Sequence, residues 1–140
     1  TIDASVFLNA FLPREPGHAQ SQALLDRLQH EAVPIIAPML LLPETAAAIG
    51  RGQSDPERGV HFSAALARLP YLMLVDLDQK LALQAAEIAA RQRLRGSDAV
   101  YAAVALRFNT PLVSLDIEQR SRAASILRAC TPGEALDDFS

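Results

Sequence analysis

Short apolar runs and longer amphipathic stretches alternate along the chain. Runs rich in β-branched residues predict strands, and apolar positions three and four residues apart predict helices. The expected strands are Thr1–Asp3, Val33–Ala37, Tyr71–Leu77 and Leu112–Leu115, with room for a further short one near Cys130. The expected helices are Ser5–Phe11, Ala19–His30, Pro38–Ile49, one opened by Ser54–Glu57 and running to about Leu69, one capped by Asp78 and ending near Leu94, Ser97–Phe108 and Glu118–Ala129.

This alternation of strands and helices predicts a mostly parallel sheet with helices on both of its faces. Right-handed crossovers then lead to a three-layer α/β/α sandwich. The 140 residues suffice for one globular domain, and no repeat, low-complexity tract or linker divides them. We therefore expect a single domain over residues 1–140. Because a first strand of three residues is short, we expect the natural chain to begin before Thr1.

The composition indicates the cellular compartment in which the protein works. A single cysteine, Cys130, rules out an internal disulfide and favours a reducing compartment. No apolar run approaches the ~18 residues of a membrane span, and no basic segment followed by an apolar stretch opens the chain. The sequence thus predicts a cytoplasmic protein with neither a signal peptide nor a membrane partner.

The formal net charge of −3 argues at first against nucleic acid, because proteins that bind phosphates usually carry an excess of basic residues. The arginines are unevenly distributed, however, and seven of the twelve lie beyond residue 90. The planar arginine fork suits phosphate because it donates two parallel hydrogen bonds. Arg93, Arg95 and Arg120 are therefore candidate phosphate-binding residues, and a solvated helix face is the alternative interpretation.

Four acidic residues fall where the topology would bring them together. Asp3 and Asp116 directly follow the first and fourth predicted strands. Asp98 lies in the first turn of the helix that leads to the fourth strand, and Glu44 lies early in the helix after the second. In parallel α/β sheets the ligand site lies beyond the carboxyl ends of the strands. Gathered carboxylates repel one another unless a cation intervenes, so this pattern predicts a site for Mg²⁺ or Mn²⁺.

Each acid also has a purely structural interpretation. Asp98 would stabilise the positive end of its helix, Asp116 would cap the final helix, and Asp3 would be a turn residue. Glu44 would be a surface charge, but it stands in the otherwise apolar segment 40–48. An unpaired carboxylate among such neighbours is costly, so a partner for Glu44 is expected.

Four stretches resemble the signature stretches of the PIN domain, in the order and near the spacing of that family. They are Ile2–Ser5, Pro43–Ala46, Gly96–Ala105 and Leu112–Asp116. The third, which contains Ser-Asp-Ala-Val-Tyr-Ala-Ala, is the most distinctive. The resemblance extends over essentially the whole chain, and the short length is most similar to the VapC-type toxins of toxin–antitoxin pairs.

The resemblance implies a PIN-like fold with a five-stranded parallel sheet, and Mg²⁺- or Mn²⁺-dependent endonucleolytic cleavage of RNA. The residues that match the acidic quartet of the family, expected both to hold the metal and to act in catalysis, are Asp3, Glu44, Asp98 and Asp116. Ser5 matches a supporting hydroxyl often found two residues after the first acid. The phosphate-binding arginines would then contact RNA, and the products would carry 5′-phosphate and 3′-hydroxyl ends.

Two further expectations concern the helices. Pro43 inside the predicted Pro38–Ile49 helix would remove a hydrogen bond to Met39 and kink the chain before Glu44. Apolar residues of the Ala19–Leu28 and Pro56–Leu69 helices exceed what one core face needs. They would suit a cognate antitoxin or a homodimer, with plain core packing as the alternative.

Rival functions fit the residues less well. A P-loop, a Gly-rich dinucleotide turn and a G-x-S-x-G elbow are all absent from the sequence. A non-catalytic PIN-scaffold interaction protein would lack one or more of the acids, and all four are present. A phosphoaspartate-type signalling domain would need a lysine at a strand end, whereas Lys80, the only lysine, stands at a helix start. The residues leave open the choice between RNA and DNA and between one and two metal ions.

Overall fold

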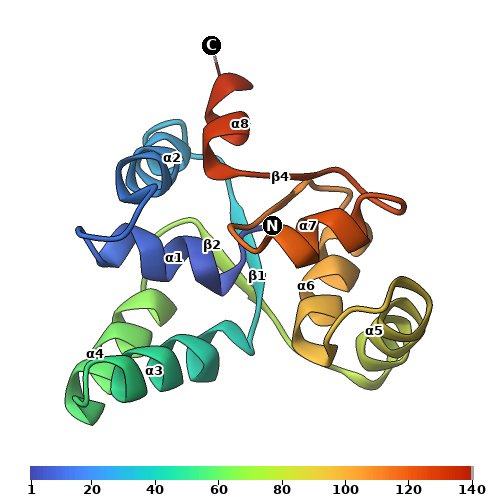
Figure 1. Ribbon diagram of the computed structural model, residues 1–140, viewed down its shortest axis with the longest axis horizontal. Helices are drawn as coiled ribbons and strands as arrows, with labels where there is room; N and C mark the ends of the chain where they lie inside the picture. The colour runs from blue at the N-terminus through green and yellow to red at the C-terminus, as the bar shows by residue number, and fades with distance from the viewer. Residues whose placement is uncertain (140) are drawn as a thin grey trace.

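The computed structural model describes residues 1–139 as short strands surrounded by helices (Figure 1). The strands are β1 (Ile35–Pro38), β2 (Leu72–Val75), β3 (Leu112–Val113) and β4 (Ala129–Cys130). The helices are α1 (Ala4–Phe11), α2 (His18–His30), α3 (Leu41–Gly52), α4 (Pro56–Ala67), α5 (Gln79–Gln92), α6 (Gly96–Arg107), α7 (Ile117–Ala123) and α8 (Pro132–Asp137). The predicted α/β class is therefore confirmed.

The strands are parallel, as predicted, but they form two separate pairs. β1 pairs with β2, with Ile35 opposite Leu72, and β3 pairs with β4. Each strand has only two to four residues, so the regular pairing is short. The described residues contain two two-stranded sheets, so the expected five-stranded sheet is not confirmed.

Residues 1–3 connect these two sheets through backbone hydrogen bonds. The Ile2 amide donates to the Ile36 carbonyl of β1 at 3.1 Å, and the Asp3 amide donates to the Val113 carbonyl of β3 at 2.9 Å. Ile2 and Val113 also form an isolated parallel bridge. The backbone at Asp3 is therefore fixed between the two sheets, which places this acid at the centre of the fold.

Helix α6 is the most enclosed helix of the fold. Every residue from Asp98 to Ala105 is buried, and Tyr101 is fully enclosed. A helix that packs on all sides needs small or apolar side chains, and four of these eight residues are alanine. The helix packs against α5 and β1. Because its first turn carries Asp98, the packing of α6 fixes the position of that carboxylate.

The helices lie on two sides of the strands. In Figure 1 strands β1 and β2 run between a group formed by α1, α2, α3 and α4 and a group formed by α5, α6 and α7. Within these groups α3 packs against α4 and α5 packs against α6, while α8 packs against α2. Across residues 1–139, every helix is too short or too polar to cross a membrane.

Helix α3 begins later than the pattern predicts. Pro38 is the last residue of β1, and the helix starts at Leu41. Pro43 thus lies in the first turn, where a residue has no intrahelical acceptor for its amide and proline costs little. The predicted loss of a hydrogen bond to Met39 is wrong because Met39 lies outside the helix. Pro43 does not interrupt α3, which runs continuously from Leu41 to Gly52.

The C-terminal part departs most from the pattern. The helix expected over Glu118–Ala129 ends at Ala123, because Ala129 pairs with β3 and tertiary pairing overrides helix propensity. The short strand expected near Cys130 is confirmed as β4. Helix α8 was not predicted, although Thr131 and Glu134 form a capping box at its start.

Helices α3 and α4 approach each other closely at Gly59. A Cβ at this position would lie 2.5 Å from the carbonyl oxygen of Ala46 in α3. We expect Gly59→Ala to lower the free energy of unfolding by about 2 kcal/mol, because overpacking against a backbone atom forces the helices apart. Chemical denaturation measures this change. Gly52→Ala is the control, because its Cβ would meet no atom within 4 Å; equal losses in the two variants would contradict the close approach.

Candidate metal centre

An open cleft of about 500 Å³ brings together all four predicted acids. The acids that line it are Asp3, Glu44, Asp98 and Asp116. The predicted supporting residue Ser5 lines it as well, together with two arginines, Arg51 and Arg95. Residues from the N-terminal end, the middle and the C-terminal third of the chain thus meet at one surface.

Each of the four acids stands at the beginning of a helix. Asp3 is the N-cap of α1 and Asp116 is the N-cap of α7. Glu44 and Asp98 lie in the first turns of α3 and α6. Helix N-termini carry partial positive charge, which stabilises nearby carboxylates. The N-cap role expected for Asp116 is confirmed, and Asp3 also proves to be an N-cap.

Asp3 is held by groups from both ends of the chain. Its Oδ2 accepts a hydrogen bond from the Ser5 amide at 2.9 Å and lies 3.5 Å from the Ser114 hydroxyl. Its Oδ1 accepts a longer bond, of 3.4 Å, from Nε2 of the fully buried Gln119. The Ser5 hydroxyl in turn accepts from the Leu115 amide at 3.1 Å. Ser5 therefore ties α1 to the segment after β3 and supports the position of Asp3.

One arginine joins Asp98 to Asp116. Arg95 donates from Nε to Oδ2 of Asp98 at 2.9 Å and from Nη2 to Oδ2 of Asp116 at 2.7 Å. Burial raises the pKa of the Asp98 carboxyl, and the Arg95 guanidinium opposes that rise. The two aspartates are thus balanced by a positive charge from the chain itself.

Glu44 has a buried carboxylate oxygen, Oε1, that has no hydrogen-bond partner within the described residues. Burial raises the pKa of Glu44, the neighbouring Tyr101 hydroxyl opposes the rise, and the charge of Asp3 adds to it. The Tyr101 hydroxyl is likewise buried and unpartnered in the described residues, and burial raises its pKa. Tyr101 is therefore the polar neighbour of Glu44 inside the fold, although Oε1 of Glu44 makes no direct hydrogen bond within the described residues.

The chemistry of the cleft fits a hard divalent cation. Carboxylate oxygens are the ligands that Mg²⁺ and Mn²⁺ prefer, and Oε1 of Glu44 has no partner among the described residues. Within residues 1–139, no three acidic, histidine or cysteine side chains meet as a ready-made metal-binding group. The Arg95 guanidinium contacts both Asp98 and Asp116. The cleft therefore combines the ligand type of a magnesium or manganese site with a positive charge already in place.

The three predicted phosphate-binding arginines occupy different places. Among the described residues, Arg95 alone of the three lines the cleft. Arg120 donates from Nη1 to the Ser114 carbonyl at 2.7 Å, after the end of β3. Arg93 ends α5 in the left-handed conformation, and its carbonyl accepts a hydrogen bond from Arg122. Arg120 thus uses one of its guanidinium nitrogens to bind the protein backbone, and the observed hydrogen bonds of Arg95 are to carboxylates of the protein.

Sequence reasoning missed four residues of the cleft or its support: Arg51, Tyr101, Ser114 and Gln119. Two of them carried a signal that could have been used. Ser114 is a polar residue in an otherwise apolar strand sequence, and Tyr101 follows Asp98 by three residues and so shares its helix face. Arg51 and Gln119 carried none, because their places at the site depend on tertiary packing.

Comparison with known proteins identifies the family. The PIN domain family model matches residues 1–125. The chain belongs to the PIN domain family, as its four signature stretches predicted. No curated protein sequence matches it.

Solved structures with a similar fold include three from toxin systems or DNA complexes. VapC20 of Mycobacterium tuberculosis, described as a toxin that cleaves the sarcin–ricin loop, is 18% identical with a TM-score of 0.70, covering 90% of this chain and 94% of its own. VapBC2 of Rickettsia felis, bound to a DNA fragment from its promoter, is 15% identical with a TM-score of 0.69, covering 93% and 96%. FitAB bound to an IR36 DNA fragment is 16% identical with a TM-score of 0.65, covering 94% of each chain. At these identities the similarity shows the fold.

Proposed function

We propose that this chain is a metal-dependent endoribonuclease and the toxin of a toxin–antitoxin pair. The observation that carries the proposal is the meeting of four carboxylates in one cleft, one of them with a buried, unpartnered oxygen. Such a cluster is unfavourable without a cation, and divalent cations assist phosphodiester hydrolysis. Membership of the PIN family and the fold shared with the RNA-cleaving toxin VapC20 support the proposal.

We assign metal binding and catalysis to the acids of the cleft, namely Asp3, Glu44, Asp98 and Asp116. A bound Mg²⁺ or Mn²⁺ ion would lower the pKa of a water molecule and polarise a phosphoryl oxygen. Asp3 is suited to hold such an ion because Ser5 and Gln119 fix its carboxylate. Glu44 is suited to orient the attacking water through its unpartnered Oε1. Cleavage would leave 5′-phosphate and 3′-hydroxyl ends.

The function is tested by incubating the purified chain with a cellular RNA pool and sequencing the new ends. With Mg²⁺ or Mn²⁺ we expect cuts at defined sites, and chelation with EDTA should abolish them. Ca²⁺ should not replace the active ions, because its larger and looser coordination shell positions water poorly. Cleavage that survives exhaustive chelation would contradict the proposal. Cleavage of DNA with intact RNA would overturn the assignment of the substrate.

RNA phosphates would contact Arg51 at the cleft, and Arg93 and Arg120 farther along the surface. We expect alanine at any of these positions to weaken RNA binding in the background of inactive Asp98→Asn. The slope of log K against log salt should flatten by roughly 0.7 for each lost phosphate contact to a single strand. Fluorescence anisotropy with labelled RNA at several salt concentrations measures the slope.

The matched control is Arg91→Ala, which removes an exposed arginine paired with Glu87 on α5. This variant has the same net charge as the others but should keep the slope of the parent protein. If Arg51→Ala, Arg93→Ala and Arg120→Ala also keep it, these arginines lie on solvated helix faces and do not contact RNA.

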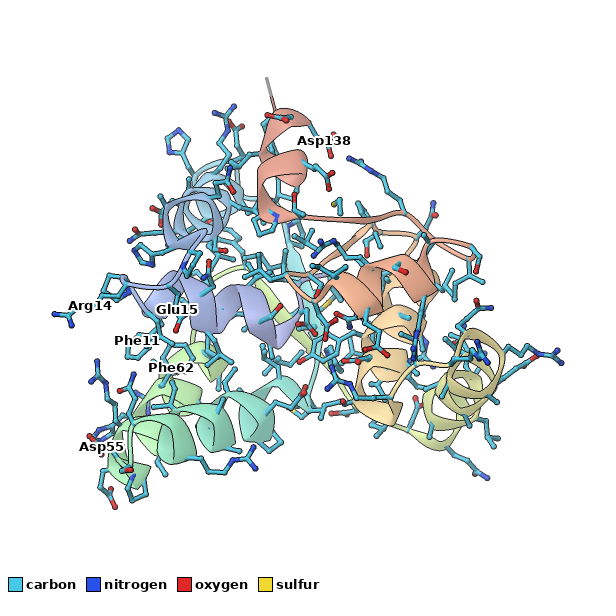
Figure 2. The ribbon with its side chains drawn as sticks, viewed as in Figure 1. Phe11, Arg14, Glu15, Asp55, Phe62 and Asp138 are labelled. Atoms are coloured by element: carbon cyan, nitrogen blue, oxygen red, sulfur yellow. The ribbon has the colours of Figure 1, made fainter. Side chains whose placement is uncertain are left out.

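An apolar hollow on another face suits a protein partner. This hollow, of about 290 Å³, lies between α1, α2 and α4. Phe11 of α1 and Phe62 of α4 line it with their ring centroids 4.6 Å apart, and Figure 2 shows the two rings between these helices. Helices α2 and α4, whose apolar residues were expected from the sequence to suit a partner, both border it together with α1.

We propose that the cognate antitoxin covers this hollow, a proposal that the shared fold of the VapBC2 and FitAB assemblies supports. The other expected partner at this face is a second copy of the chain, which would form a homodimer. Light scattering of the chain alone distinguishes them, since a monomer has a mass of 15.1 kDa and a dimer has twice that mass. A dimer that Phe62→Glu dissociates would assign the face to a second copy of the chain.

A further inference from the structure

The proposed metal centre already contains a cation of the chain itself. Arg95 contacts two different carboxylates, through Nε to Asp98 at 2.9 Å and through Nη2 to Asp116 at 2.7 Å. The two aspartates come from different parts of the fold, the start of α6 and the segment after β3. One guanidinium thus joins the two elements at the cleft and balances charges that would otherwise repel each other.

The three side chains differ in how far they are exposed to solvent. The Arg95 side chain is 69% exposed, whereas those of Asp98 and Asp116 are 12% and 29% exposed. Asp98 is buried in the first turn of α6, and Asp116 is held as the N-cap of α7 by the Gln119 backbone amide. The carboxylates are therefore fixed, and the guanidinium covers them from the solvent side.

Arg95 contacts one oxygen of each aspartate, Oδ2, and Oδ1 of Asp116 accepts from the Gln119 backbone amide, so a divalent ion that binds Asp98 and Asp116 competes with donors already in place. We propose that Arg95 is the internal counter-ion of the metal-free centre, and that the incoming ion displaces its guanidinium from at least one of the two aspartates. This inference rests on the proposed metal site. The displaced guanidinium stays at the cleft that Arg95 lines, where it can contact a phosphate of the substrate.

If Mn²⁺ displaces the Arg95 guanidinium, two results are expected that a purely structural role of Arg95 would not produce. First, Arg95→Ala should bind Mn²⁺ more tightly than the unmodified protein, by about fivefold, because the ion no longer has to break an ion pair. Second, Arg95→Ala should melt at a lower temperature than the unmodified protein without metal, where the acids are left unbalanced. Saturating Mn²⁺ should remove most of that difference in melting temperature.

The experiment is calorimetric titration with Mn²⁺, without RNA, of the unmodified protein, Arg95→Ala and Arg51→Ala, with thermal melts of each protein with and without Mn²⁺. Arg51 is the matched control because it lines the same cleft but donates to the Ala47 carbonyl of its own helix. We expect tighter binding in Arg95→Ala and a much smaller change in Arg51→Ala. If Mn²⁺ binding becomes equally tighter in both variants, only the general positive potential of the cleft matters. This result would contradict the proposed displacement of Arg95 by the ion.

The outcomes also separate this inference from the proposed function. If the unmodified protein binds Mn²⁺ and Arg95→Ala binds it no more tightly, the proposed displacement is wrong while the metal site stands. If none of the three proteins binds Mn²⁺, the assignment of the metal site is wrong, and so is the proposed displacement of Arg95.

Discussion

Replacing Asp98 by asparagine is expected to abolish RNA cleavage, with a loss of about a thousandfold or more in rate, while the fold stays intact. The amide keeps the size of the side chain and its place in the first turn of α6, but it removes a negative charge from the site proposed to hold the ion. A loss of about 4 kcal/mol of transition-state stabilisation corresponds to this factor. Single-turnover cleavage at saturating Mn²⁺ measures the rate, and circular dichroism checks the fold.

The matched control for this variant is Asp55→Asn. Asp55 caps α4 and accepts from the Arg58 amide at 3.0 Å, and it is not among the residues that line the cleft. Asparagine caps helices as well as aspartate does, so activity and stability should stay near those of the unmodified protein. A wild-type rate in Asp98→Asn would contradict the role of Asp98 in the metal centre.

Replacing Glu44 by glutamine is expected to change stability in opposite directions with and without metal. The pKa of Glu44 is raised, chiefly by burial, so its ionisation destabilises the metal-free fold as the pH rises above the usual range for a free glutamate. At neutral pH the neutral glutamine should therefore raise the melting temperature of the metal-free protein, by about 3 °C if it relieves about 1 kcal/mol. The variant should also lose the pH dependence that Glu44 contributes.

With Mn²⁺ the same substitution should be unfavourable. At an ion concentration of 100 times Kd, binding stabilises the unmodified protein by about 2.7 kcal/mol, which corresponds to roughly 8 °C in melting temperature. Loss of the Glu44 charge should weaken Mn²⁺ binding at least about tenfold and remove half or more of this increase. Thermal melts over a series of Mn²⁺ concentrations, at pH 5 and pH 7, measure both effects.

Glu57→Gln is the control, because Glu57 lies in the first turn of the neighbouring helix α4 and is not among the residues that line the cleft. It should show neither the gain without metal nor the loss with metal. If Glu44→Gln responds to Mn²⁺ as the unmodified protein does, Glu44 takes no part in holding the ion.

The acids of the site could be predicted from the sequence because each stands at the boundary of an element. Strand ends and helix starts leave local signals, such as the apolar run before Asp116 and the distinctive helix sequence around Asp98. Once the strands are known to be parallel, their carboxyl ends must share an edge. The apolar surroundings of Glu44 likewise predicted that its carboxylate needs a partner, and its Oε1 is unpartnered among the described residues.

The contacts that hold the acids could not be predicted in the same way. The Arg95–Asp116 pair joins residues 21 positions apart, and the Gln119–Asp3 pair joins residues 116 positions apart. Such contacts depend on how the elements pack, and no local pattern of polar residues marks them. The sequence pattern suggested that Arg95 faces a phosphate, whereas in the structure it binds two carboxylates of the chain itself.

The third predicted strand, Tyr71–Leu77, is longer than the observed strand β2 for a related reason. Tyr71 and Leu77 extended the apolar run of the third predicted strand, but both are 48% exposed and lie outside β2. The backbone of Tyr71 has a positive φ of 67°, which no regular strand allows. Apolar character alone does not distinguish a paired strand residue from an exposed one beside it, and this explains why a longer third strand was expected.

The most direct test of the proposed metal centre is a crystal structure of the unmodified protein grown with Mn²⁺, with an anomalous difference map recorded for manganese. We predict an anomalous peak in the cleft at about 2.0–2.3 Å from carboxylate oxygens of the proposed ligands Asp3, Glu44, Asp98 and Asp116. We also predict that the Arg95 guanidinium has left at least one of Asp98 and Asp116. A cleft without a peak at saturating Mn²⁺, with Arg95 still bound to both, would contradict the proposed metal centre.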